Sequence, residues 1–534
     1  MGRKVKKIDT GNSSFVKLIT SDNLYVDKTS YLYRLVSKSG AYYCLSRPRR
    51  FGKSLTVGTL EEIFRGNREL FRGLYIDSTD YDWKVYPVIH IDFGAISYIN
   101  TDNLRSQIRN LVLETALRYG VDIPSDYEYN ESLRYLIEKL AERGEDVVVL
   151  VDEYDRILSD NMFSPDVEEI RHVLRDFYSV LKAQDGNIRF CFITGVTKFS
   201  KLSIFSTMNN LFDLSFDRNY ATMLGYTQKE LEDNFALYIE KGMEATGMDR
   251  ESYLGKLKAM YDGYRFAPGA ETVYNPVSVG SFFARGGEDW ESYWIETGGT
   301  KLLMDMARKV HFNIAEDLEK SVRKESMSSF DIVEMTTGKV TPLKYKSLLL
   351  QSGYLTIKNT EKGKDLLLGF PNEEVEEAVS LKLLSVYGGE EAEENYDSDD
   401  ILRQFREGNT QGVIDNLFSV YASIPPREKQ KEMEADFQGM FYAMMVVIHA
   451  SVNLEVVTNR GRIDAVVKTP CHVYVMEFKR DESAEAALRQ INDRGYWEKY
   501  RAWSNGSTRT VHLLGINFSS EKRNIDGWKE EILK

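Results

Sequence analysis

The chain has 534 residues, a net charge of −13 and a hydrophobic content of 42%, values typical of a large acidic globular protein. At roughly 100–200 residues per domain, this length predicts about three domains. The charge excludes a global attraction to nucleic acid, so contacts with phosphates must come from local basic clusters. Cys44, Cys191 and Cys471 are far apart, which excludes a disulfide framework or zinc site and favours reduced, buried thiols.

The N-terminal segment "MGRKVKKIDTG" is basic, but no apolar stretch follows it, so it does not resemble a signal peptide. The longest apolar run, residues 440–448, is too short to cross a bilayer. We therefore expect a cytoplasmic protein that does not contact membranes. The sequence leaves the oligomeric state open, a homo-oligomer included.

Residues 41 to about 225 alternate apolar segments with helical patterns, which predicts a parallel α/β sheet. In the run "VVVLV" five consecutive apolar residues indicate a strand that is buried on both faces. The expected strands are residues 41–46, 86–93, 146–152 and 188–195, and the expected helices are residues 53–64, 103–119, 131–143 and 167–182.

The segment "SRPRRFGKS" ends like a phosphate-binding loop, G-x-x-x-x-G-K-[ST], but Arg47 stands where the first glycine is due. It follows a predicted strand and opens a predicted helix, the context in which backbone N–H groups point at an anion. Lys53 would reach the outer phosphates and Ser54 would offer its hydroxyl to Mg²⁺. The cofactor-binding candidates in this loop are Arg47, Arg49, Arg50, Phe51, Gly52, Lys53 and Ser54.

An arginine does not enter positive φ cheaply, so the entrance of this loop must differ from the glycine form, or Pro48 must shape it. Arg47, Arg49 and Arg50 would in exchange place three positive charges beside the phosphates. The alternative for each of these arginines is a solvated basic loop.

Two further strand ends complete the expected nucleotide site. Ligands of parallel sheets bind at the carboxyl ends of the strands, and Asp152 and Glu153 follow the buried strand there. Asp152 would hold Mg²⁺ through water, and Glu153 would orient or deprotonate the attacking water. Thr194 ends the strand at 188–195, and it either senses the γ-phosphate or is an ordinary strand terminus.

The middle of the chain is more helical. We assign residues 1–225 to the nucleotide-binding domain, 226–300 to a helical lid subdomain and 301–386 to a helical coupling region. In the last of these, "YKSLLLQSGYLTIK" and "DLLLGF" predict a helix followed by a hairpin, as in a winged helix or in a plain connecting subdomain. An acidic linker with helices follows at 387–424, and a separate C-terminal unit at 425–534.

Several of these motifs, in this order, are similar to the bacterial AAA-ATPase-like family: "YVDKTSYLYRL", "SRPRRFGKSL", "VDEYD", "ITGVTKFSKLSIFSTMNNL", "YDGYRF" and "QSGYLTI". The resemblance covers about residues 8–370, and the loop without its first glycine is the usual form in that family. It implies bound ATP, or another NTP, with Mg²⁺. It also implies that a C-terminal PD-(D/E)XK nuclease-like domain is common in relatives.

The C-terminal unit contains two apolar segments, each of which carries one acidic residue. "RIDAVVK" and "HVYVMEFK" predict a hairpin, and a turn between Pro470 and Cys471 would place Asp464 opposite Glu477. Strand alternation puts Glu477 and Lys479 on one face. Two carboxylates this close favour a bound Mg²⁺, with Mn²⁺ as a substitute and the Phe478 carbonyl as a further ligand. The alternative is an ion-pair cluster on the surface of a hairpin.

An Asp followed by Glu-x-Lys on the next strand resembles the core of the PD-(D/E)XK nucleases, and Lys479 would then orient or deprotonate a water for attack on a phosphodiester. That resemblance implies a glutamate on the preceding helix, for which Glu434 matches best and Glu432 second. It also implies a glutamine on the following helix that points into the site, for which Gln490 matches.

The sequence therefore predicts an α/β multidomain protein with a P-loop NTPase sheet, a helical or winged-helix middle region and a C-terminal PD-(D/E)XK nuclease-like fold. The expected function is an ATPase coupled to a Mg²⁺-dependent nuclease that acts on DNA rather than RNA. The alternative is a signalling or scaffold ATPase whose tail binds nucleic acid or protein without cleavage. A small-molecule kinase fits less well, because no acceptor site follows the Asp152-Glu153 strand.

Overall fold

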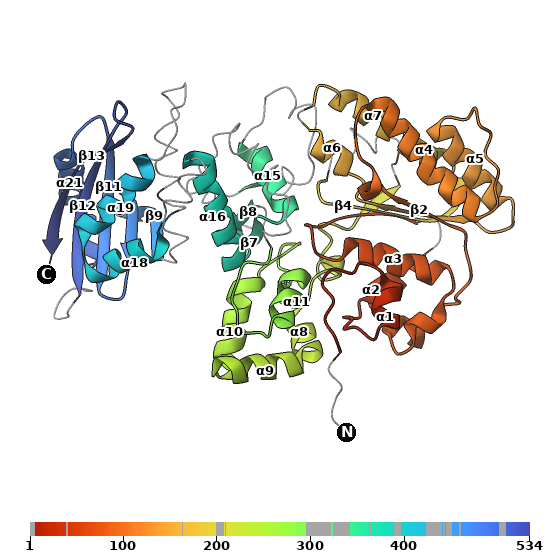
Figure 1. The fold of residues 1–534 in the computed structure, drawn as a ribbon, viewed down its shortest axis with the longest axis horizontal. Coiled ribbons are helices and arrows are strands. Elements are labelled where there is room, and N and C mark those ends of the chain that lie inside the picture. The colour runs from red at the N-terminus through yellow and green to blue at the C-terminus, as the bar shows by residue number, and fades with distance from the viewer. Residues whose placement is uncertain are drawn as a thin grey trace. The chain divides into compact units, whose positions relative to one another are not determined.

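A computed structural model of the chain (Figure 1) separates into two compact units, and each is described here by itself. The first unit comprises residues 1–298 and 321–374, and the second comprises residues 299–320 and 375–534. The structure describes residues 6–38, 41–162, 164–198, 210–294, 342–361, 365–388, 397–422, 451–458, 461–500 and 509–533, with isolated positions at 208, 322–323, 441 and 444.

The first unit is built on a five-stranded sheet in the order β2-β3-β4-β1-β5, and every pair of neighbours is parallel. Its strands are β1 (Ala41–Ser46), β2 (Val88–Asp92), β3 (Val147–Asp152), β4 (Ile188–Gly195) and β5 (Leu211–Asp213). The four longer strands confirm the predicted parallel α/β sheet, and β5 is an addition to it. Residues 147–151 of β3 are fully buried, as expected for a central strand that is covered on both faces.

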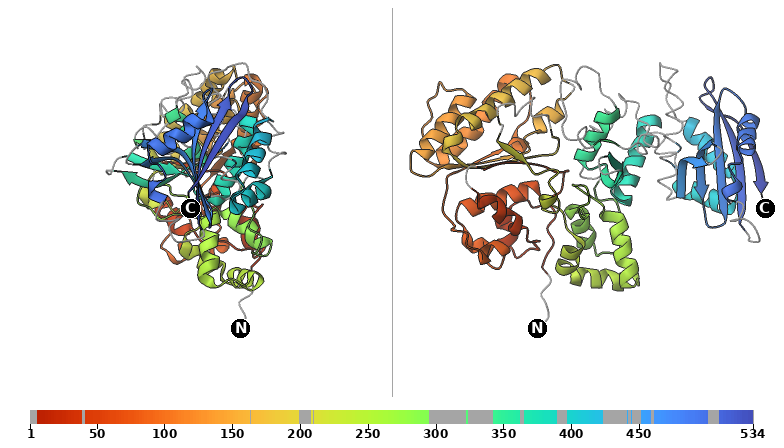
Figure 2. Two further views of the ribbon diagram at one scale, coloured as in Figure 1. Left: turned by 90° about the vertical axis from the view of Figure 1, so that its left-hand side faces the viewer. Right: turned by 180° about the vertical axis from the view of Figure 1, so that it is seen from behind.

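Helices cover both faces of this sheet (Figures 1 and 2). On one face lie α1 (Phe15–Thr20), α2 (Thr29–Val36) and α3 (Lys53–Phe64), and on the other lie α4 (Thr101–Arg118), α5 (Tyr129–Ala141) and α7 (Val167–Ala183). The short helix α6 (Arg156–Asp160) follows β3. The carboxyl ends of β1, β3 and β4 therefore meet at one edge of the sheet, where the motifs singled out in the sequence lie together.

A helical region and a hairpin complete the first unit. The helices are α8 (Gln228–Asn234), α9 (Ala236–Thr246), α10 (Arg250–Tyr261) and α11 (Pro276–Ala284). Helix α15 (Pro342–Ser352) then leads into the antiparallel pair β7 (Thr356–Glu361) and β8 (Asp365–Gly369), and the two-residue strand β6 (Val322–Arg323) pairs with β8. The predicted order of helix and hairpin is confirmed, and its assignment as a winged helix stays a prediction.

The second unit has a mixed five-stranded sheet in the order β13-β12-β11-β10-β9, in which β11 and β12 run parallel. Its strands are β9 (Ser451–Thr458), β10 (Gly461–Lys468), β11 (His472–Arg480), β12 (Thr510–Ser519) and β13 (Asn524–Leu533). Helix α21 (Ala484–Asp493) covers the face that carries Val473 and Val475, through a cluster that includes Ile491.

The opposite face of this sheet is covered by α18 (Ser398–Glu407) and α19 (Thr410–Ala422), while α16 (Glu373–Gly388) precedes them in the chain (Figure 1). The Tyr474 hydroxyl donates a hydrogen bond to the Phe405 carbonyl, and the Tyr421 ring packs on Phe518 at 5.2 Å. Residues 398–422 lie in the range predicted as an acidic linker with helices, and in the structure the two helices pack on the C-terminal sheet.

Two smaller expectations have different outcomes. Cys44 and Cys191 are buried as expected, but Cys471 is exposed, because it lies in the turn between β10 and β11 and not inside a strand. Among the described residues, no helix combines the length and apolar character that crossing a membrane requires.

Candidate functional site

The loop between β1 and α3 turns sharply at two positions. Gly52 is the N-cap of α3 and has φ = 88°, and Arg50 has φ = 71°. A side chain at Gly52 would meet no atom within 4 Å, so the left-handed backbone and not a lack of space favours glycine there. Ser54, in the first turn of α3, is exposed. The helix N-terminus and the Ser54 hydroxyl are therefore both available to an anion and its counterion.

Lys53 is buried and donates hydrogen bonds from Nζ to the carbonyls of Arg47 and Pro48, each at 3.0 Å. Burial lowers the pKa of its ammonium, and the carboxylates of Asp152, Asp155 and Glu153 oppose that shift. The ammonium thus lies within the loop, near the acidic end of β3. A phosphate in the loop would offer Lys53 a stronger, charged acceptor than the two carbonyls.

The predicted partners of Lys53 meet at the same edge of the sheet. Asp152 is 2% exposed, and its Oδ1 accepts a hydrogen bond from the Thr194 hydroxyl of the neighbouring strand β4. Glu153 has φ = 50°, and its Oε2 accepts from Arg156 at 3.0 Å. Lys53, Asp152 and Thr194 are therefore brought together, whereas the Glu153 carboxylate is held by an arginine on the same turn.

Asp155 supports this edge of the sheet and was missed in the sequence. Its carboxylate is buried and accepts the backbone N–H of Val196 at 3.0 Å and that of Thr197. Burial raises its pKa, and those two N–H groups and Lys53 counter the shift. A Cβ at Gly195 would lie 2.4 Å from the Asp155 carboxylate, which explains the glycine after Thr194. The second aspartate of "DEYD" was the available signal.

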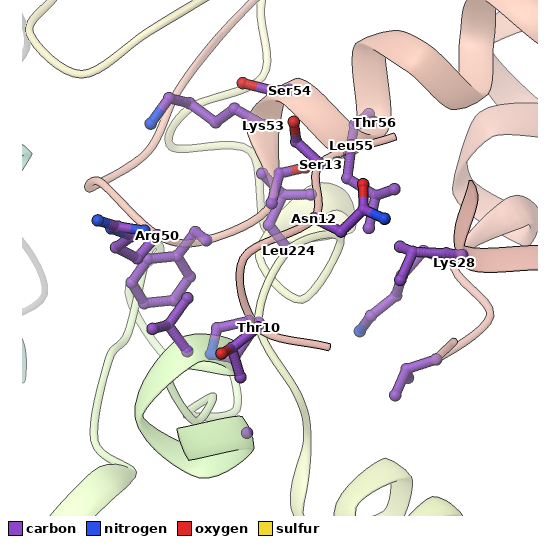
Figure 3. A pocket seen from close by; sticks show the side chains of 18 of the residues that line it. Thr10, Asn12, Ser13, Lys28, Arg50, Lys53, Ser54, Leu55, Thr56 and Leu224 are labelled. Carbon is purple, nitrogen blue, oxygen red and sulfur yellow. Dashed lines mark hydrogen bonds between the residues drawn. The ribbon is translucent and has the colours of Figure 1, made fainter. Parts of the chain in front are cut away.

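A cavity of about 510 Å³ opens beside the loop (Figure 3). Lys53, Ser54 and Thr56 of α3 lie on one side, while Lys28 reaches in from the start of α2. The remaining wall is formed by the N-terminal segment 8–13 and by apolar side chains from distant parts of the unit, namely Leu18, Val26, Leu224, Phe235 and Val277. Neither the N-terminal segment nor Lys28 was predicted to belong to the site, because neither carries a phosphate-binding pattern.

The three arginines at the loop entrance separate into two groups. Arg49, Arg50 and Phe51 line the cavity, and their contact with a nucleotide stays a prediction. Arg47 does not line it: its side chain is 1% exposed, and its guanidinium donates to the carbonyls of Ser46, Ser215 and Tyr220. The expected position of Arg47 beside the phosphates is thus not the observed one. A buried guanidinium needs acceptors for its N–H groups, and main-chain carbonyls supply them for Nη1 and Nη2, while Nε has no partner among the described residues.

The second site lies in the C-terminal sheet. Strands β10 and β11 pair from Ala465–Met476 to Lys468–Val473, which confirms the register expected from the "TPC" turn. Asp464 continues this ladder by a side-chain contact: its Oδ2 accepts a hydrogen bond from the Phe478 backbone N–H at 2.8 Å. The carboxylate of Asp464 therefore lies beside residues 477 and 478, at the carboxyl end of β11.

Glu477 is 2% exposed, and burial together with the nearby charge of Asp464 raises the pKa of its carboxyl to about 7. Its Oε1 accepts hydrogen bonds from Lys479 Nζ at 3.2 Å and from the Gln490 amide. Its Oε2 has no hydrogen-bond partner among the described residues, although it is buried. A buried carboxylate oxygen without a partner is costly, and a cation bound beside it would remove that cost.

Gly515 explains how Gln490 reaches this carboxylate. It pairs with Glu477 across β11 and β12, and a Cβ on it would lie 2.4 Å from the Ala484 carbonyl. Helix α21 therefore packs directly on the backbone of β12 and presents Gln490 to Glu477. No sequence pattern marked this glycine, because its reason is close packing and not a turn.

The candidate metal ligands are only partly covered by the structure. Asp464 and Glu477 are described, whereas Glu434 and its alternative Glu432 lie outside the described residues. The described part of the chain contains no group of three or more Asp, Glu, His or Cys side chains that could hold a metal ion. The buried Oε2 of Glu477, which lacks a hydrogen-bond partner within the described ranges, and the adjacent Asp464 nevertheless fit one divalent cation that prefers oxygen ligands.

Comparison with known families gives matches for both sites. The model described as "Predicted AAA-ATPase" matches residues 9–205, and that of the PD-(D/E)XK nuclease superfamily matches residues 432–528. A protein of Azotobacter chroococcum mcd 1, called "Uncharacterized protein in vnfD 5'region", is 34% identical and aligns over 99% of both chains. The chain therefore belongs to the predicted AAA-ATPase family, in a form with a C-terminal PD-(D/E)XK nuclease superfamily domain.

Solved structures show weaker similarity. ORC2 of Aeropyrum pernix, in its ADPNP-ADP complexes, is 16% identical and has a TM-score of 0.28, with 67% of this chain and 92% of that chain covered. Cdc6p of Pyrobaculum aerophilum is 12% identical and has a TM-score of 0.23, with 64% and 88% covered. At these scores neither structure supports an argument about the sites of this chain.

Proposed function

We propose that this chain is a Mg²⁺-dependent nuclease, acting on DNA, whose activity is coupled to an ATP-binding and ATP-hydrolysing unit. The observation that carries the proposal is the cluster at the end of β11, where Asp464, Glu477 and Lys479 converge and Glu477 Oε2 is buried without a partner among the described residues. An ion-pair cluster on an exposed hairpin would leave both carboxylate oxygens in water. This cluster instead withdraws one oxygen from water, with no hydrogen-bond partner for it in the described part of the chain.

The nucleotide half of the proposal rests on the P-loop and its cavity. Lys53 and the N-terminal N–H groups of α3 would bind the phosphates, and the exposed Ser54 and the buried Asp152 would hold Mg²⁺. The apolar part of the cavity, with Leu224 and Val277, suits a nucleobase. For Glu153 to act on a water, its carboxylate has to exchange its bond to Arg156 for one to that water.

In the nuclease half, Asp464 and Glu477 would hold the divalent cation, which when bound supplies a positive charge that stabilises the pentavalent phosphate of the transition state. Lys479 Nζ lies 3.2 Å from Glu477 Oε1, so it can donate a hydrogen bond toward a water or a phosphate oxygen next to the ligands. Gln490 fixes the rotamer of Glu477 by its amide hydrogen bond. This division of roles requires Glu477 to be ionised.

Metal binding separates this proposal from a scaffold that does not cleave. Isothermal titration of the full-length chain with Mn²⁺ is compared with the same titration of Glu477→Ala and of Lys53→Ala. The nuclease proposal predicts a site that is lost in Glu477→Ala and kept in Lys53→Ala. An identical Mn²⁺ isotherm for the wild type and Glu477→Ala would instead favour the scaffold, in which the C-terminal unit binds a partner without metal chemistry.

A further inference from the structure

The entrance of the P-loop is held first by Arg47, whose side chain does not line the cavity. Arg47 donates from Nη1 to the carbonyls of Ser46 and Ser215, at 2.9 and 2.8 Å, and from Nη2 to that of Tyr220 at 3.0 Å. Its guanidinium also stacks on the Phe266 ring at 4.2 Å. Burial lowers its pKa to about 9, so the group remains charged at neutral pH. One side chain thereby connects the end of β1 to two segments far along the sequence.

The opposite side of the same turn is held by close packing. Gly353, which follows α15 and has φ = 87°, is so near Pro48 that a Cβ on it would lie 2.6 Å from the Pro48 side chain. Phe51, 1% exposed, packs edge-on against Tyr264 and Phe266, with ring centroids at 4.8 and 5.3 Å. The motifs "YDGYRF" and "QSGYL" therefore meet at the P-loop entrance.

These contacts act on the residues that would bind phosphate. The carbonyls of Arg47 and Pro48 are the acceptors of Lys53 Nζ, so a shift of this turn displaces the ammonium as well. A first glycine would let the loop turn by backbone freedom alone. This chain has Arg47 in place of the first glycine, so the conformation of the turn depends on contacts from outside the loop.

We propose that Arg47 is a positioning residue of the nucleotide site, which fixes the P-loop entrance through its three carbonyl contacts and its stacking on Phe266, with Gly353 packed against Pro48 as its counterpart. The hairpin region after α15 is thereby tied to the nucleotide site. The inference rests on the proposed ATP-binding function. It also gives a physical reason for an arginine in place of the first glycine.

The test is calorimetric titration of ATP with Mg²⁺ into full-length wild type, Arg47→Lys and Gly353→Ala. Lysine keeps the charge but lacks the planar fork that reaches three carbonyls and stacks on a ring. We expect both variants to bind ATP roughly tenfold or more weakly, because small displacements of positioning groups have effects of this size. Gly73→Ala is the matched control for Gly353→Ala, since Gly73 has φ = 79° and no atom within 4 Å of an added Cβ.

The stoichiometry of the titration separates positioning from simple stability. A residue that only stabilises the fold would lower the number of binding-competent molecules and leave the dissociation constant of the rest unchanged, and that result would overturn the inference. Phe266→Leu, which removes the ring beneath the Arg47 guanidinium together with its edge contact to Phe51, replaces Arg47→Lys if the latter does not fold, and weaker ATP binding is again expected. Absence of ATP binding by the wild type would refute the proposed function itself, whereas normal binding by all variants refutes only the role of Arg47.

Discussion

The Glu477→Gln substitution gives a stability test of the nuclease-like site that needs no substrate. Burial and Asp464 raise the pKa of the Glu477 carboxyl from 4.5 to about 7 in the folded chain. Between pH 4.5 and about pH 7 the unfolded chain therefore binds fewer protons than the folded chain. The free energy of unfolding consequently falls as the pH rises through that range. At about 1.4 kcal/mol per pKa unit, the ionised carboxylate costs the fold about 3 kcal/mol above pH 7.

Glutamine keeps an oxygen that can accept from Lys479 and Gln490, and it places an amide N–H₂ where Oε2 has no partner among the described residues. Because the charged bond to Lys479 weakens, we expect a net gain of about 1–3 kcal/mol at pH 8 and almost none at pH 4.5. The gain should appear in EDTA, where no divalent cation offsets the buried charge.

Hydrogen exchange followed by mass spectrometry measures this change for the C-terminal unit alone, through peptides of β11 and β12. After correction for the intrinsic exchange rate at each pH, wild type and Glu477→Gln are compared at pH 4.5 and pH 8 in EDTA. Peptides of β3 in the first unit serve as the internal control. Equal protection of wild type and variant at pH 8, or lower protection of the variant, would refute the reasoning that the buried charge of Glu477 destabilises the fold.

Three further predictions concern individual side chains. Lys53→Ala should lower ATP hydrolysis by about 100-fold, because the phosphates lose a charge-assisted hydrogen-bond donor. Phosphate release by the purified full-length chain measures this rate, and unchanged turnover would remove Lys53 from the site. Glu153→Gln should retain ATP binding in calorimetry but lose hydrolysis by about 100-fold, and a parallel loss of binding would assign Glu153 a structural role. Gln490→Ala should reduce DNA cleavage by about tenfold and weaken Mn²⁺ binding, since residues that orient a ligand typically contribute this much. Gln411→Ala, which changes an exposed side chain of α19, is the control.

The elements that could be predicted from the sequence are those with strong local patterns. The buried run before Asp152 and the apolar run before the P-loop each form a strand at the expected residues, because a strand covered on both faces is apolar throughout. Strand β5 was missed, since it has three residues and Phe212 is 61% exposed, so it carries no pattern of burial.

The site residues could be predicted where residues close together in the sequence determine the geometry. The hairpin register followed from strand alternation around one turn, which is why the pairing of residues 465–468 with 473–476 could be worked out in advance. The buried position of Arg47 could not, because its acceptors at Ser215 and Tyr220 are more than 160 positions away. Gly515 was equally hidden, since a glycine needed for helix packing has no local signature.

The central claim, a nuclease in the C-terminal unit, is tested most directly by cleavage of supercoiled DNA. The wild type and the Glu477→Ala, Lys479→Ala double variant are each incubated with supercoiled DNA and either Mg²⁺ or Mn²⁺, with and without ATP. Linear DNA, single-stranded DNA and RNA serve as further substrates. We predict that the wild type converts the plasmid to nicked or linear products, that EDTA stops the reaction and that the double variant is inactive. Cleavage by the double variant at the wild-type rate would contradict the account.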